Sequence, residues 1–404
     1  MIIQRPKEEE EIKTMKKWTL VYGRRKTGKS FLVENFIPYD DYFFVNRDMT
    51  ILSKKTKTHI DYDTLVEVME RDLESNKTVV IDEFHRLGGR FLDFLHSMKK
   101  SGRAILLTST LFLAKKLVST KSPILGLFYE KQIDIISLEE SLNSIKKHKL
   151  GNKQLLESAI MLREPITADY FDEKEDIRET YSKLLKSSVN TVPALIGEIF
   201  LEEERSLSAT YEGIIRAVAN GKVVSGEISS VLYSRGLISK DDPSAIQPYL
   251  GNLVKIGLLT RIAVYGKTRF VYKIPSPLIR LFFYADEKYS ISERKFSRTE
   301  ALRVLDELIP KIVEDNIREH IAYKFGLVEA IIEAKDYDID GVLLRFKKPE
   351  IVLEVKWRDR IDAEDVRKAE STLGSINAKR RLMFVPDKSK VHSDLIEIID
   401  VNDL

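Results

Sequence analysis

The sequence predicts an α/β protein with more than one domain, and three observations support this fold class. The chain has 404 residues, more than the roughly 100 to 200 that one hydrophobic core usually organises. Short apolar runs alternate with amphipathic segments over residues 18–140 and again over 299–404, as they do where strands and helices follow one another. The region between these blocks has apolar residues at helical spacing. We therefore expect two α/β domains separated by a largely helical region.

The first block, residues 1–140, predicts a parallel sheet. Consecutive strands are separated by segments long enough for the crossovers that parallel pairing requires. The expected strands are Trp18–Tyr22, Tyr42–Asn46, Thr78–Ile81, Ala104–Thr108 and Lys131–Ile136.

The middle of the chain predicts two helical units and a connector. Residues 141–205 are expected to form a helical lid, with breaks at Pro165 and Pro193. Residues 206–275 predict a winged helix, whose order is three helices and then two strands. Its expected elements are the helices Ser208–Ala219, Glu227–Arg235 and Pro243–Lys255 and two strands around Gly266. The amphipathic segment 276–298 is expected to link this unit to the last block.

The last block, residues 299–404, predicts a second α/β domain. A helix to about residue 324 precedes two adjacent strands, and a further helix and strand follow. The strands are expected near Leu327–Glu333, Tyr337–Leu344, Glu350–Val355 and Arg381–Val385, with the second helix starting at Ala363.

Composition excludes several classes of protein. The chain has no cysteine, which rules out disulfides, thiolate metal sites and cysteine nucleophiles, and six scattered histidines leave little for a zinc site. Any metal is therefore expected to be bound by oxygen. A formal charge of +3 means that a nucleic-acid footprint must be local. The charged first residues do not fit a signal peptide, and no 18 uninterrupted apolar residues follow, so we expect a soluble cytoplasmic protein with no membrane contact.

One motif predicts a phosphate-binding loop. The spacing G-x-x-x-x-G-K-S stands between a predicted strand and a predicted helix, which is the context that such a loop needs. The two glycines let the backbone N–H groups wrap around phosphate at a helix N-terminus. Lys29 would neutralise the β- and γ-phosphates, and Ser30 would ligate Mg²⁺. ATP with Mg²⁺ is thus the expected cofactor, bound by Gly23, Arg24, Arg25, Lys26, Thr27, Gly28, Lys29, Ser30 and Phe31.

A second motif supplies the carboxylates that phosphoryl transfer requires. Residues 78–83 form an apolar strand that ends in Asp82 and Glu83. Asp82 would hold Mg²⁺, directly or through water, and Glu83 would polarise the attacking water. Ser109, at the end of another expected strand, could present a hydroxyl to the γ-phosphate or the water.

The last block contains a D…E-x-K pattern. Glu354 and Lys356 are two residues apart on an expected strand and share one face, and Asp340 lies on the preceding strand. Asp340 and Glu354 could bind Mg²⁺ while Lys356 orients or deprotonates a water for phosphodiester hydrolysis. Glu319 could add a ligand, although a solvated helix face is the stronger interpretation for it.

These motifs together resemble the archaeal ATPase family, which are AAA+-related P-loop NTPases of the STAND type. The resemblance lies in YGRRKTGKS, VVIDEFHRL, LLTST and SPILGLFYE, in that order. It implies an ATPase core, a lid, a winged helix and, for the pattern in the last block, a PD-(D/E)xK, restriction-endonuclease-like domain. Two departures stand out: Ser122 to Leu127 lacks the arginine of the family's SPLYGR motif, and His85 replaces the usual glutamine. Arg24, Arg25 and Arg90 are alternative cations or solvated surface.

Three functions remain open at this level. The first is an ATPase that switches the placement of its distal domains on DNA, and the second is a DNA nuclease regulated by ATP. The third is a non-catalytic signalling scaffold that forms homo-oligomers with ATP. DNA, branched or double-stranded and held mostly by its backbone, is the expected partner because cations cluster at Arg345, Lys347, Lys348, Lys356, Arg358 and Arg360 and again at Lys379, Arg380 and Arg381.

The winged helix offers weaker support for base reading. Its expected recognition helix starts with Asp241 and Asp242, and Pro248 is expected to interrupt it. Sequence-specific reading, non-specific backbone contact and a packing role all remain open for this unit.

Overall fold

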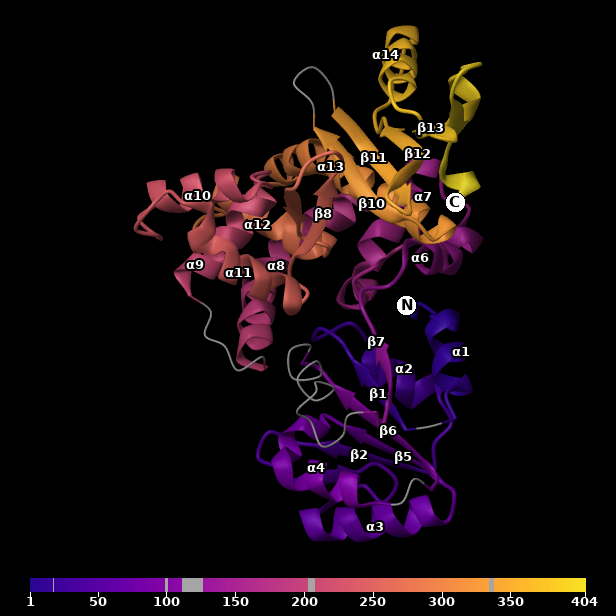
Figure 1. Ribbon diagram of the computed structural model, residues 1–404, viewed down its shortest axis with the longest axis vertical. Helices are drawn as coiled ribbons and strands as arrows, with labels where there is room; N and C mark the ends of the chain where they lie inside the picture. Colours follow the sequence, from indigo (N-terminus) through magenta and orange to yellow (C-terminus); the bar gives the residue numbers. More distant parts are fainter. Residues whose placement is uncertain (17, 99–100, 111–125, 203–207, 334–337) are drawn as a thin grey trace.

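Two seven-stranded sheets organise the molecule (Figure 1). The structure is a computed structural model, and it describes all residues except 17, 99–100, 111–125, 203–207 and 334–337. The first sheet and its helices form the lower, indigo and violet part of Figure 1, and the rest of the chain forms the upper part.

The first sheet has the strand order β4-β3-β2-β5-β6-β1-β7. The five expected strands are all present, and β2, β5, β6, β1 and β7 pair in parallel. Two short antiparallel strands, β3 and β4, were not expected, because each has only three residues. The elements are α1 (Pro6–Thr14), β1 (Thr19–Tyr22), α2 (Lys29–Phe36), β2 (Asp41–Val45), β3 (Ile51–Ser53), β4 (Thr58–Ile60), α3 (Tyr62–Glu74), β5 (Thr78–Asp82), η1 (Phe84–Leu87), α4 (Gly88–Ser97), β6 (Arg103–Thr108) and β7 (Tyr129–Gln132).

Residues 133–136 differ from the prediction. The last strand of this sheet forms at Tyr129–Gln132, two residues earlier than expected, and the chain then leaves the sheet. Ile133 and Ile136 are buried, yet in two different core clusters, which explains why their apolar character looked like a strand.

The middle region is helical, and its longest described helix contains a proline. Its elements are α6 (Leu138–Ile145), η2 (Lys146–His148), α7 (Asn152–Leu162), η3 (Pro165–Tyr170) and α8 (Ile177–Glu202). The expected break at Pro193 is wrong, because α8 runs through it. Val192, Leu195 and Ile196 next to it are buried in the largest core cluster, and this packing offsets the lost backbone hydrogen bond. Within the described residues, α8 is the one helix long and apolar enough to cross a membrane, a test that core helices also pass.

Three helices and a hairpin follow in the expected order. They are α9 (Ala209–Ala219), α10 (Ser225–Ser234), α11 (Pro243–Lys255), β8 (Thr260–Val264) and β9 (Phe270–Lys273). The expected interruption at Pro248 is also wrong, since α11 is continuous and buries Ile246, Leu250 and Leu253.

The second sheet joins this hairpin to the C-terminal strands in the order β14-β13-β12-β11-β10-β8-β9. Strand β8 pairs in parallel with β10, where Ala263 lies opposite Ala330. The segment expected to be a connector contains α12, a helix with Leu281, Phe282 and Phe283 in the core. The elements are α12 (Pro277–Tyr289), α13 (Arg298–Phe325), β10 (Val328–Glu333), β11 (Asp338–Arg345), β12 (Lys348–Val355), α14 (Ala363–Gly374), β13 (Arg380–Phe384), η4 (Lys388–Lys390), β14 (Glu397–Ile399) and η5 (Val401–Asp403).

The close approach of β1 and β7 predicts that Gly23→Ala destabilises the protein. A Cβ at Gly23 would lie 2.0 Å from the carbonyl oxygen of Ile133. We expect a loss of about 1 to 3 kcal/mol in the free energy of unfolding, measured by denaturant titration. The control is Gly89→Ala in α4, where a Cβ would meet nothing within 4 Å and should leave stability equal or slightly higher. Equal stability of the two variants would contradict the prediction.

Candidate nucleotide site and C-terminal carboxylate cluster

The expected phosphate-binding loop connects β1 to α2. Gly28, at the N-cap of α2, has φ +89°, a left-handed conformation that glycine adopts readily. The Lys29 Nζ donates to the carbonyl oxygens of Gly23 (2.8 Å) and Arg24 (2.9 Å). Thr27 Oγ1 also donates to the Arg24 carbonyl, at 2.8 Å. The loop is thus a tight turn with its lysine held across it. Phe31 lies one turn into α2 and is 46% exposed.

The expected magnesium ligands lie around one phenol. Tyr42 on β2 donates from its hydroxyl to Asp82 Oδ2 at 2.7 Å, and Ser30 is hydrogen-bonded to the same hydroxyl. Burial, with the charge of Asp82, raises the pKa of Tyr42 far above its ordinary value, so the phenol stays a donor. A hydroxyl and a carboxylate oxygen are the hard donors that Mg²⁺ prefers, so Ser30 and Asp82 fit this ion.

Glu83 is held in an uncommon backbone conformation at the end of β5. Its φ of 57° and ψ of 36° are left-handed, which is rare for a residue other than glycine, asparagine or aspartate. Its Oε2 accepts a hydrogen bond from Ser109 Oγ at 3.0 Å. Because β6 lies between β5 and β1, Ser109 at its end stands between the carboxylate strand and the loop strand. The sequence named both residues, and the structure brings them together.

His85 supports the same region from η1. Its Nδ1 is 2.9 Å from Thr108 Oγ1 and 3.4 Å from Glu83 Oε2. Burial, with the charges of Arg86 and Lys29, lowers the pKa of His85 to about 4. The imidazole is therefore neutral at pH 7 and acts as a polar spacer between the two strand ends.

The arginines of the loop are paired rather than solvated. Arg24 is 4% exposed and pairs with Glu164 at 2.6 Å, just beyond α7. Arg25 pairs with Glu198 of α8 at 2.6 Å. Sequence reasoning missed Glu164 and also Arg5, which donates to the Thr27 carbonyl at 2.9 Å.

Two further parts of the sequence bear on a cation near the phosphates: Arg90 and the segment from Ser122 to Leu127. Arg90 pairs with the exposed Asp63 at 2.7 Å. Residues 122–125 of the segment without an arginine lie outside the described residues.

Asp340 and Glu354 converge on neighbouring strands, as expected. Gly341 on β11 pairs with Leu353 on β12, which places the two carboxylates close together. Asp340 Oδ2 accepts a hydrogen bond from the Val355 N–H at 2.9 Å, and Glu354 forms an ion pair with Lys356. Burial, with the charge of Glu354, raises the pKa of Asp340.

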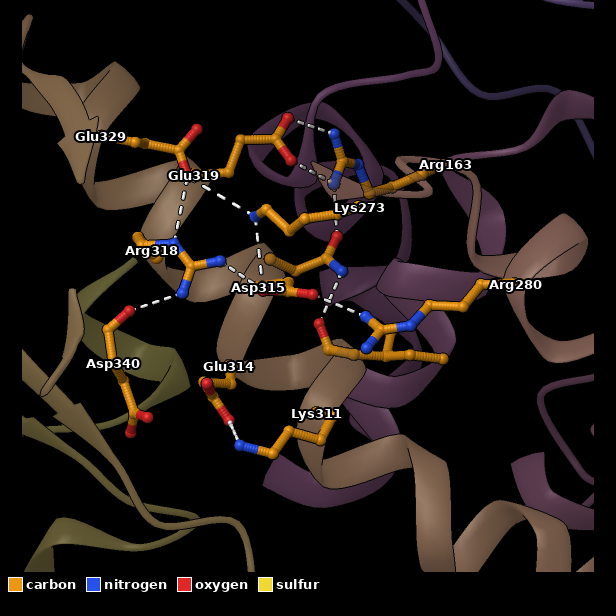
Figure 2. Close-up of polar contacts among 12 residues, drawn as sticks. Arg163, Lys273, Arg280, Lys311, Glu314, Asp315, Arg318, Glu319, Glu329 and Asp340 are labelled. Carbon is orange, nitrogen blue, oxygen red and sulfur yellow. Dashed lines mark hydrogen bonds and ion pairs between the residues drawn. The ribbon is translucent and has the colours of Figure 1, made fainter. Parts of the chain in front are cut away.

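The helix carboxylate that joins this cluster is Glu314, which sequence reasoning missed. Burial, with the charge of Asp340, raises the pKa of Glu314 to about 7, and Lys311 pairs with it at 2.8 Å. Figure 2 shows Glu314 on the side of Asp340, whereas Glu319 turns to Arg163, 2.6 Å away. The proposed ligand Glu319 is therefore not at this cluster.

We call Glu314, Asp340, Glu354 and Lys356 the carboxylate cluster. Among the residues that the structure describes, no group of three or more His, Cys, Asp or Glu has the arrangement of a metal site. In this conformation Lys311, from outside the cluster, pairs with Glu314, and Lys356 pairs with Glu354.

A partly buried ionic network lies between the nucleotide site and the carboxylate cluster (Figure 2). Arg163, next to Glu164, donates to Glu319 and Asn316 on α13. One turn earlier on α13, Asp315 contacts Lys273 of β9 at 3.3 Å and Arg280 of α12 at 2.5 Å. Burial opposes it, yet the charges of Lys273, Arg318 and Arg280 hold the pKa of Asp315 well below its ordinary value.

The ionic network reaches the carboxylate cluster through Arg318. Arg318 donates to the carbonyl oxygen of Asp340 and pairs with Glu329 at 3.2 Å. A cleft of about 730 Å³ runs along the network, and its lining extends from Arg24 and Thr27 to Lys273 and Glu319.

One protein family is similar to the N-terminal part of the chain. Residues 15–142, less than half of the chain, match the family described as AAA domain. This match covers the parallel sheet and the loop described above, so the N-terminal part is similar to AAA domains. The comparison with curated proteins found no match.

Several solved structures are similar to the chain. A Walker-type ATPase from Pyrococcus abyssi has 18% identity and a TM-score of 0.49, covering 70% of this chain and 96% of that one. The ORC2 protein of Aeropyrum pernix, in ADPNP–ADP complexes, has 11% identity and a TM-score of 0.40, covering 78% and 95%. A STAND protein with a tetratricopeptide repeat sensor from Pyrococcus horikoshii has 14% identity and a TM-score of 0.31, covering 79% and 51%.

The buried His85 predicts a loss of stability on acidification. Its pKa of about 4 in the folded state lies below the ordinary value near 6.5, so the unfolded chain binds the proton more readily between these values. Stability contributed by the neutral ring is complete above about pH 6.5 and is lost as the pH falls towards 4. A glutamine at this position cannot be protonated. His85→Gln should therefore reduce the loss in the free energy of unfolding on acidification by about 2 to 3 kcal/mol.

The measurement is the free energy of unfolding from pH 7.5 to 4 for the wild type and His85→Gln. The control is His392→Gln, because the His392 imidazole is 88% exposed. This variant should show the same pH dependence of stability as the wild type. Parallel curves for the wild type and His85→Gln would show that His85 titrates normally.

Proposed function

We propose that this protein binds and hydrolyses Mg·ATP at the loop from Gly23 to Ser30 and uses the cycle to change how its distal domains engage DNA. The observation that carries the catalytic part is the pairing of Glu83 with Ser109. A carboxylate in a left-handed backbone conformation, fixed by a hydroxyl from the neighbouring strand, is an arrangement suited to aligning a water.

Each residue of the loop region has a defined task in this proposal. Backbone N–H groups of the loop and the N-terminus of α2 bind the phosphates, and Lys29 exchanges its contacts with the carbonyls of Gly23 and Arg24 for phosphate oxygens. Ser30 and Asp82 would hold Mg²⁺, which neutralises charge on the phosphates when bound. Glu83 orients the attacking water and takes up its proton.

The ionic network supports the proposed link to the distal domains. Arg24 belongs to the loop and Glu164 does not, and both side chains are buried. Any change in the position of Arg24 therefore acts on Glu164, on the adjacent Arg163 and through it on α13. The basic clusters of the C-terminal domain supply the charge that DNA requires.

The loop and its carboxylate predict two different defects. Lys29→Ala should weaken ATP binding strongly. Glu83→Gln should bind ATP normally, but its rate of ATP hydrolysis should fall at least about 100-fold. Binding is measured with a fluorescent ATP analogue and turnover by phosphate release. Glu70→Gln on the exposed side of α3 is the matched control and should behave as the wild type.

The outcomes separate the open functions. Unchanged ATP binding by Lys29→Ala would overturn the proposal at its first step. ATP binding without turnover in the wild type, accompanied by ATP-driven oligomers in light scattering, would instead support the signalling scaffold.

A second function, Mg²⁺-dependent DNA cleavage, is favoured by the carboxylate cluster. Three carboxyl groups from α13, β11 and β12 and the lysine that follows β12 make up this cluster. Arg358, two residues after Lys356, lines a cavity of about 600 Å³ whose lining also includes the cations Lys153, Arg360 and Lys390 and the carboxylates Asp359 and Asp387, but none of the cluster residues. In this proposal Asp340 and Glu354 would hold the metal once Lys356 leaves Glu354, and Lys356 would then act on the water.

Supercoiled and branched DNA with Mg²⁺ test this second function. Glu354→Ala and Lys356→Ala should each reduce nicking at least about 100-fold without changing ATP turnover, because they act in a separate site. The matched control is Glu364→Ala on α14, whose side chain is 65% exposed. Cleavage that survives both cluster substitutions would exclude the cluster as its source.

A further inference from the structure

The tip of the β11–β12 hairpin presents an exposed aromatic side chain. Phe346 is 93% exposed, the highest value among the large apolar residues that the structure describes. The hairpin closes with two residues, Phe346 and Lys347, between Arg345 and its partner Lys348. A ring so exposed adds almost nothing to the packing of the fold.

The backbone at this tip is of a kind that these residues rarely adopt. Phe346 has φ +49° and Lys347 has φ +67°, the pair of positive values that defines a type I′ turn. Asparagine followed by glycine adopts this turn readily, whereas a bulky residue with positive φ is an outlier. The residues at the tip are therefore unfavourable for stability, which points to a role outside folding.

The surroundings of the tip combine apolar groups with cations. Phe325, 37% exposed, ends α13, and its carbonyl accepts a hydrogen bond from Arg345 at 3.0 Å. Val328, 66% exposed, lies on β10 opposite Leu344. The guanidinium of Arg380 stacks 5.1 Å from the Phe325 ring. We call Phe325, Val328 and Phe346, with Arg345, Lys347, Lys348, Lys379 and Arg380, the tip surface.

Positive charge dominates the tip surface. Arg345 and Lys379 share Glu350, and Arg380 pairs with Glu397. For Lys347 and Lys348 no ion pair is found within the described part of the chain. The five cations of the tip surface thus have only two carboxylate partners. This excess of positive charge favours binding of a polyanion and disfavours binding of a basic protein.

We propose that the tip surface binds DNA with unpaired bases, that Phe346 stacks on a base, and that the flanking cations hold the phosphates on either side. This inference rests on the proposed action on DNA and specifies which surface makes contact. A base stacks on any aromatic face, and adjacent cations supply backbone contacts without sequence preference. A protruding ring between lysine and arginine meets both requirements within a few residues.

The tip has a fixed relation to the carboxylate cluster because both lie on the same two strands. Asp340 and Arg345 are five residues apart on β11, or about 17 Å at the usual rise of a strand. A DNA strand held at the tip would therefore have to extend about 17 Å along the hairpin to reach the cluster. The hairpin would then set where an unpaired region stands relative to the cluster.

Fluorescence anisotropy of the full chain with three labelled DNAs tests the proposal. The probes are a 20-nucleotide single strand, a blunt duplex of the same sequence and a branched junction. Phe346→Asn should weaken binding to the single strand and the junction about tenfold and should weaken duplex binding less. Phe346→Trp should retain wild-type affinity, because it restores an aromatic face.

Stability provides a second, opposite readout. Phe346→Asn fits the turn better and should raise the midpoint of thermal unfolding while DNA affinity falls. Lys347→Gly also relieves the turn and should additionally flatten the salt dependence of DNA binding. The control, Leu395→Asn, removes another side chain that is 71% exposed and should change neither property.

Two results would overturn the proposal in different ways. If the wild type binds the DNAs and Phe346→Asn binds them equally well, the tip assignment is wrong while the action on DNA stands. If the wild type binds none of the three, both fail, and the tip is better explained as a contact for a protein.

Discussion

The buried ion pair between Arg24 and Glu164 fixes the phosphate-binding loop to the helical part of the molecule. Glu164 is 1% exposed and Arg24 4%, so each charge depends on the other for its stability. The preceding residue in the chain, Arg163, is equally buried and pairs with Glu319 on α13. Two consecutive residues therefore contact the loop on one side and α13 on the other. Breaking either ion pair would leave an uncompensated charge inside the protein.

This constraint explains why the two candidate sites belong to one structure. Helix α13 carries Glu314 of the carboxylate cluster and also Arg318, which donates to the carbonyl of Asp340. The loop and α13 are thus connected through Glu164 and its sequence neighbour Arg163, and Arg318 connects α13 to the backbone of β11. Such contacts have defined partners and geometry, which makes them suited to transmitting a discrete rearrangement rather than a gradual one.

Among the nine described residues other than glycine that have positive φ, Glu83 and Phe346 stand at proposed contacts. Glu83 adopts a left-handed conformation where the attacking water would be aligned, and Phe346 does so where an unpaired base would stack. Neither residue suits its conformation on energetic grounds, and glycine or asparagine would fit better. Sites of this kind sacrifice stability for the placement of a particular side chain.

The sequence by itself determined the local elements and the motifs that depend on short spacing. The strand before the loop, the strand that ends in Asp82 and Glu83, and helix α11 from Pro243 to Lys255 all follow from patterns within a few residues. Only the tertiary structure decided the pairing of β8 with β10, the continuity of α8 through Pro193, and the choice of Glu314 over Glu319. These depend on packing between distant segments. A helix with several carboxylates does not reveal which of its faces meets the sheet until the sheet is in place, and a buried arginine looks like a solvated one until its partner, 140 residues away, is known.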